Sequence, residues 1–158
     1  MIAPPHKHIA CLGLLAALLT GCAATVAEGC MPSPVVWDQP PDDPAVGGAP
    51  QPGHYFVNSD KSIWASAWWA AEDAHGVWDV DAQGYGIKVG WFRPEGAALH
   101  ISGRRLDAPA APLVAQIPCC YPTRFQATAL IFPTEGCWQV EARAGDRELS
   151  FVVWVSED

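Results

Sequence analysis

The chain has 158 residues, of which 17 are acidic and nine are lysine or arginine, so its formal net charge at pH 7 is −8. Binding to nucleic-acid phosphates or to anionic lipid headgroups requires a basic surface, and this charge balance argues against both. Residues 54–158 suffice for one domain with a single core, and no internal repeat divides them.

The first 21 residues are predicted to be a lipoprotein signal peptide. Lys7 gives the start a positive charge, and the uncharged apolar run Ile9–Gly21 follows it. A helix of 13 residues is too short to cross a bilayer core, which takes about 20 residues, but it suits a signal peptide. The run ends in Leu19-Thr20-Gly21-Cys22, which resembles the lipobox of bacterial lipoproteins. The resemblance implies a lipidated Cys22 and an extracytoplasmic location in the bacterial cell envelope, on the outer membrane or the cell membrane.

Residues 22–53 are predicted to form a lipid-anchored, proline-rich spacer. Seven of the 22 residues from Met31 to Pro52 are proline. Proline fixes φ and lacks an amide hydrogen, so such a segment favours extended structure without a core of its own. Within it, the apolar run Val35–Trp37 is expected to be a short element that docks back on the domain.

Residues 54–158 are predicted to form an all-β antiparallel sandwich. Alternation is clearest at the end, where Trp138, Val140 and Ala142 should face inward on one strand of a hairpin. A turn over residues 144–146 leads to its partner strand, Arg147–Val155. The earlier runs of strand length are Gly86–Phe92, Ala98–Gly103, Pro112–Ile117 and Phe125–Phe132. Their spacing of about ten residues, with Gly, Pro and Asp in between, is typical of sandwiches.

One segment, Lys61–Gly76, fits two descriptions. Asp60 could cap a helix that stops at Gly76, with Trp64 and Trp68 on one stripe. The runs "SIWAS" and "AWWA" also contain strong strand formers. We favour strands, because a single helix fits a sandwich poorly.

Three stretches carry a family resemblance: Leu99–Asp107, Phe125–Val140 with its F-P-x-x-G-C-W motif, and Leu149–Val155. The chain from about residue 30 onward resembles an uncharacterised family of secreted bacterial immunoglobulin-like domains. The resemblance implies an immunoglobulin-like sandwich and a disulfide between Cys30 and Cys137, but no activity. The segment "IPCCYP" departs from the family pattern, so the resemblance says nothing of Cys119 and Cys120.

The cysteine count favours disulfides. Cys11 leaves with the signal peptide and Cys22 takes the lipid, and the remaining four are Cys30, Cys119, Cys120 and Cys137. An even number in an exported chain indicates disulfides, here with three possible connectivities. One joins Cys30 to Cys137 and leaves the adjacent pair Cys119–Cys120; the others join each distant cysteine to one member of the doublet. We favour the first.

Nothing in the sequence points to an enzyme, a cofactor or a metal. The histidines of the mature chain are His54, His75 and His100, and none lies beside a cysteine or four residues from another histidine. Four carboxylates lie close in sequence, but calcium needs several converging oxygens, and D-x-D alone is a poor indication. These residues are Glu72, Asp73, Asp79 and Asp81.

Eight tryptophans are the remaining signal. They could fill the core, or some could form an exposed platform for sugar rings. The candidate ligand contacts are Trp68, Trp69 and Trp91. We expect a non-enzymatic structural or binding module, whose partners are the membrane through its lipid and an envelope protein or polysaccharide. The alternative is a carbohydrate-binding module, and the third is a redox protein or other enzyme.

Overall fold

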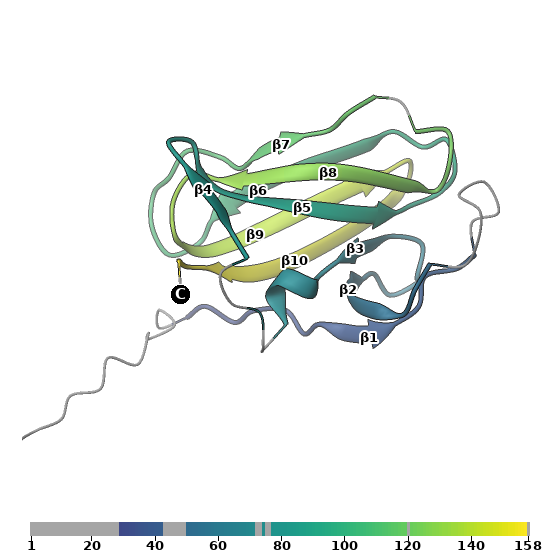
Figure 1. The fold of residues 1–158 in the computed structure, drawn as a ribbon, viewed down its shortest axis with the longest axis horizontal. Helices are drawn as coiled ribbons and strands as arrows, with labels where there is room; N and C mark the ends of the chain where they lie inside the picture. Colours follow the sequence, from purple (N-terminus) through teal and green to yellow (C-terminus); the bar gives the residue numbers. More distant parts are fainter. Residues whose placement is uncertain (1–28, 43–49, 72–73, 75–76, 120, 158) are drawn as a thin grey trace, which may run out of the picture.

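The computed structural model describes residues 29–42, 50–71, 74, 77–119 and 121–157. They form two antiparallel sheets packed face to face, an all-β sandwich of the immunoglobulin-like kind (Figure 1). This confirms the predicted fold class. None of the helices in this described part is long and apolar enough to span a membrane.

The larger sheet has seven strands, six of them in one continuous order. Their order is β1 (Val36–Asp38), β2 (Gly53–Val57), β3 (Trp64–Ser66), β5 (Gly84–Phe92), β8 (Phe125–Phe132) and β7 (Val114–Gln116). The seventh, β4 (Asp79–Asp81), pairs with the first residues of β5, whereas β3 pairs with its last residues. Strand β8 pairs with β5 from Tyr85 to Phe92, so β5 and β8 form the middle of the sheet.

The smaller sheet has the order β10 (Arg147–Val155), β9 (Gly136–Ala144) and β6 (Leu99–Arg105). Strands β9 and β10 are the predicted hairpin, with Gly145 at φ 64° in its turn. Trp138, Val140 and Ala142 are fully buried, as their alternation predicts. The larger sheet likewise contains three of the predicted runs, in β5, β7 and β8.

Large apolar side chains from both sheets form the core between them. The rings of Phe56 on β2 and Phe151 on β10 stack in parallel across the sandwich, with centroids 4.1 Å apart. Buried indoles keep hydrogen-bond partners: Trp91 Nε1 donates to Thr128 Oγ1 and Trp138 Nε1 to the Thr134 carbonyl, both at 2.9 Å. Four of the eight tryptophans, Trp64, Trp69, Trp91 and Trp138, are therefore buried with their indole N–H groups hydrogen-bonded.

The segment from Lys61 resolves into two elements. Trp64–Ser66 is strand β3, as favoured, but Trp68–Ala70 is a turn of 3-10 helix, η2, so the strand interpretation is wrong there. Asp60 caps no helix; its carboxylate accepts hydrogen bonds from the amide and the hydroxyl of Ser62. Residues 72–73 and 75–76 of this segment lie outside the described residues.

Residues 29–42 are part of the folded unit. Residues 29–38 run along one long edge of the sandwich and end in β1, which pairs with β2 as expected for the docking element (Figure 1). Ser33 and Val152 exchange two hydrogen bonds of 2.8 and 2.9 Å, and Pro40 is fully buried. The sandwich thus extends upstream of residue 54, into the segment predicted to be spacer.

Candidate functional site

A groove crosses the outer face of the larger sheet. Two adjoining hollows of about 560 and 400 Å³ share Trp68, Lys88, Gln116 and Ala129, so they form one continuous depression over β5 and β8. Strand β7 borders one side of it, and β4 and η2 border the other.

Small residues occupy part of the floor of the groove. On β5 the outward positions include Gly86 and Gly90, and on β8 they include Ala127 and Ala129. A Cβ on Gly90 would lie 3.0 Å from the ring of Phe125, and one on Gly86 would lie 3.1 Å from the Asp79 carbonyl oxygen. Larger side chains at these positions would fill the depression or displace its walls.

The walls combine one aromatic ring with planar polar groups. Trp68 is 50% exposed, because the 3-10 turn of η2 directs it outward while Trp69 packs inward. Carboxylates and amides surround the same space, with one ammonium group rising from β5. These residues are Asp79, Asp81, Gln83, Lys88 and Gln116. An apolar face beside a few polar groups is the usual composition of a small-ligand site.

Two of the three predicted tryptophan contacts are wrong. Trp91 is fully buried, because it shares the inward parity of Ile87 and Val89 on β5. Trp69 is 4% exposed and packs edge-on against Phe56 and Trp78. Neither can touch a ligand at the surface, and Trp68 alone of the three remains available. A platform of three tryptophans is therefore not present.

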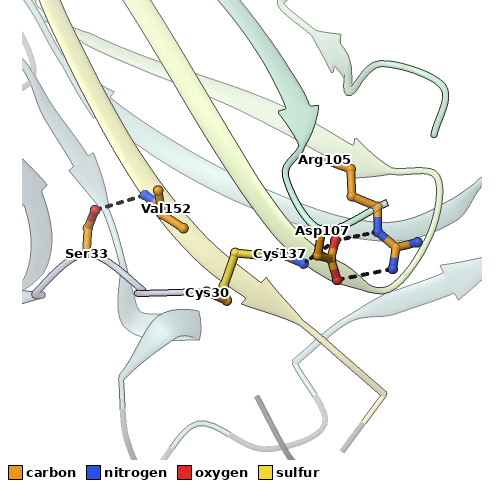
Figure 2. Close-up of a disulfide and its surroundings, with 6 residues drawn as sticks. All are labelled: Cys30, Ser33, Arg105, Asp107, Cys137 and Val152. Atoms are coloured by element: carbon orange, nitrogen blue, oxygen red, sulfur yellow. Dashed lines mark hydrogen bonds and ion pairs between the residues drawn. A yellow bond between two sulfur atoms is a disulfide. The ribbon is translucent and has the colours of Figure 1, made fainter. Parts of the chain in front are cut away.

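The second cluster surrounds the disulfide. Cys30 is bonded to Cys137 at the start of β9, with Cα atoms 5.7 Å apart, which confirms the predicted bond between these two cysteines (Figure 2). Beside it, Arg105 donates from Nε to Asp107 Oδ1 at 2.7 Å, and Asp107 accepts the Cys137 amide at 3.2 Å. The hydrogen bond from Arg105 holds the pKa of Asp107 below its ordinary value. Arg105, Asp107 and the Cys137 amide hydrogen-bond to one another, so this cluster supports the structure around the disulfide.

The other predicted residues are scattered. Cys22, Cys120, Glu72, Asp73 and His75 lie outside the described residues. Cys119 is also disulfide-bonded. His54 stacks edge-on against Trp37, and His100 lies on the exposed face of β6. Within the described ranges, no three side chains of His, Cys, Asp or Glu gather in a way that could hold a metal ion.

The fold and the groove define an immunoglobulin-like sandwich with a hollow on one sheet face. The chain matches no family model, no curated protein sequence and no solved structure. The resemblance to secreted bacterial domains stays a prediction, and the geometry of the groove has to carry the functional argument.

Sequence reasoning missed most of the groove. Lys88 and Gln116 are ordinary surface residues in sequence, and they line the same groove only because β5, β8 and β7 lie side by side. The available signal was the set of small residues at alternating positions, Gly86 and Gly90 on one strand and Ala127 and Ala129 on the next. Small residues at the outward-facing positions of two adjacent strands leave that part of the sheet surface without large side chains. It becomes a groove only where larger side chains of the neighbouring elements border it.

Proposed function

We propose that this protein is a lipid-anchored, non-enzymatic binding module on the extracytoplasmic side of the bacterial cell envelope. The observation that carries the binding role is the groove, which exposes an indole ring beside five polar side chains on a sheet face that also has small residues. The lipobox at residues 19–22 supports the anchoring, and the acidic charge balance is consistent with attachment through lipid instead of basic side chains.

A saccharide chain is the ligand class that this groove suits best. Sugar rings present apolar C–H faces edged by hydroxyl groups, so they stack on an indole and hydrogen-bond to carboxylates and amides. Trp68 supplies the ring, while Asp79, Asp81 and Gln116 supply planar acceptors and donors. The continuous groove also accommodates a chain, since its two hollows are joined. An envelope polysaccharide therefore fits better than an apolar peptide.

Trp68→Ala is expected to weaken saccharide binding by about 30-fold, because removing an aromatic anchor at the centre of a contact costs about 2 kcal/mol. The measurement is affinity electrophoresis against soluble neutral polysaccharides, with co-sedimentation on insoluble peptidoglycan. The matched control is Trp37→Ala, which removes an exposed tryptophan outside the groove. Equal losses in both variants, or no retention of the wild type by any of these glycans, would contradict a saccharide site at Trp68.

Cys22→Ser is expected to move the protein from the membrane fraction to the soluble extracytoplasmic fraction. The serine hydroxyl does not accept the thioether-linked lipid of a lipobox cysteine, and the acidic domain offers no electrostatic attachment. Fractionation and mass spectrometry of the N-terminal peptide measure the outcome. Ser33→Ala leaves the lipobox intact and serves as the control. A wild-type N-terminal peptide that lacks the mass of the acyl chains would contradict lipid anchoring.

A further inference from the structure

We infer that the edge formed by residues 29–37 lies against the bilayer surface, so that the lipid anchor holds the sandwich in a defined orientation. The inference rests on the lipidation of Cys22 proposed above. It goes beyond that proposal, because it names a protein surface that contacts the membrane in addition to the lipid. We call residues 29–37 the anchor edge; it is the segment along the lower side of the sandwich in Figure 1.

The first argument is the length of chain between the lipid and the fold. The disulfide fixes Cys30 to β9, and the paired hydrogen bonds fix Ser33 to β10. Only the residues from 22 to 30 can separate the bilayer from the sandwich, a span of at most about 30 Å. A spacer extending to residue 53 would have allowed roughly 100 Å. A domain of this size is about 35 Å across, so a tether of at most about 30 Å cannot reach the bilayer when the side of the sandwich opposite Cys30 faces the membrane.

The second argument is the chemistry of that edge. Residues 29–37 carry no charged side chain. Seven large apolar side chains are exposed among the described residues, and this segment contributes three of them: Met31 at 83%, Val36 at 41% and Trp37 at 68%. Tryptophan favours the interface between headgroups and acyl chains, where an apolar ring with one polar N–H is well accommodated.

The carboxylate that follows the anchor edge is paired. Asp38 follows Trp37 directly, and its carboxylate lies 2.8 Å from Lys61 Nζ. The edge therefore approaches a bilayer without an unpaired carboxylate from β1 being forced against the headgroups. Such a surface suits a zwitterionic bilayer, in which apolar contact and not charge attraction provides the binding.

The test measures tryptophan quenching in the lipidated, full-length protein. The protein is reconstituted into phosphatidylethanolamine–phosphatidylcholine vesicles whose acyl chains carry bromine close to the headgroup. Trp37→Phe removes the fluorophore but keeps an apolar ring, and Trp68→Phe, in the groove, is the matched control. We expect bromine to quench the wild type and Trp68→Phe alike, and Trp37→Phe to lose more than half of that quenching.

Lipid attachment is verified in the same samples by the mass of the N-terminal peptide. Lipidated protein whose quenching is unchanged by Trp37→Phe would overturn the anchor edge and leave the lipid anchor standing. A chain that carries no lipid at Cys22 would overturn the proposed anchoring and this inference with it.

Discussion

Replacing Arg93 with methionine is expected to lower the free energy of unfolding by about 2–4 kcal/mol. Arg93 follows β5 and is 2% exposed. Its guanidinium donates to Gln126 Oε1 at 2.8 Å, to the Tyr121 carbonyl at 2.9 Å and to the Pro94 carbonyl at 3.0 Å. Methionine fills a similar volume but leaves these acceptors without a donor, at a cost of about 1–3 kcal/mol for each that stays buried.

Part of that loss is offset. All three of these acceptors are neutral, and burial lowers the pKa of Arg93, which shows that the site disfavours its charge. Removing the guanidinium relieves this desolvation cost, so the expected effect is smaller than the three lost hydrogen bonds would suggest. The sign remains destabilising, because methionine cannot replace any of the donors.

Urea denaturation measures the change in the free energy of unfolding, provided that the dependence of this free energy on urea concentration (the m-value) is the same in the variant and the wild type. The control is Arg143→Met, in which the same substitution removes an ion pair with Glu148 whose side chains are about two-thirds exposed. That variant should differ from the wild type by less than about 1 kcal/mol. Equal stabilities for the two variants would show that the Arg93 hydrogen bonds contribute little.

Arg93 and its partner Gln126 also support the loop that contains Cys119 and Cys120. Arg93 binds the Tyr121 carbonyl, and Gln126, which Arg93 orients, donates to the Pro118 carbonyl at 3.1 Å. The two contacts fix the loop on either side of Cys119. Hydrogen exchange in residues 117–124 should therefore rise in Arg93→Met more than the global loss of stability explains.

The β-sandwich could be predicted because runs of strand length recur along the sequence, and the hairpin near its end alternates apolar and polar residues on β9. Phe125–Phe132 is a strand with the predicted bounds, and the hairpin of β9 and β10 buries the expected face. The parity of Ile87 and Val89 could also have placed Trp91 inside. The exposed-platform hypothesis counted tryptophans without applying that parity.

Other features depended on contacts between distant residues. Trp69 lies in a 3-10 turn, where alternation no longer assigns faces. Arg93 reads as a surface residue, yet two of its acceptors lie 28 and 33 residues away and meet it only after folding. The proline-rich segment read as a spacer because proline indicates extended chain; extended chain is also what can lie along a sheet edge, as Ser33 does beside β10.

The double variant Cys30→Ser, Cys137→Ser is expected to lose about 4–5 kcal/mol of stability. The disulfide closes a loop of 107 residues, and the chain-entropy model assigns a loop of about that size 4–5 kcal/mol. Chemical denaturation of the oxidised wild type and the double variant measures this loss. Non-reducing peptide mapping should first show Cys30 and Cys137 in one linked peptide. A free thiol at Cys137 would contradict the disulfide itself.

Ser33→Ala distinguishes the contribution of the disulfide from that of the hydrogen bonds between Ser33 and Val152. It removes the hydrogen bond from the Val152 amide to Ser33 Oγ, which is 2.9 Å long, and keeps the disulfide, so it should cost only about 1 kcal/mol. If the double variant lost no more stability than Ser33→Ala, the disulfide would contribute far less to the stability of the sandwich than the chain-entropy model assigns to it. A much larger loss, in one cooperative transition, would mean that the bond stabilises the whole sandwich while it sets the length of the tether. Removing the disulfide would then free the start of the anchor edge from β9 and also destabilise the sheet that forms the groove, because the same bond supports both.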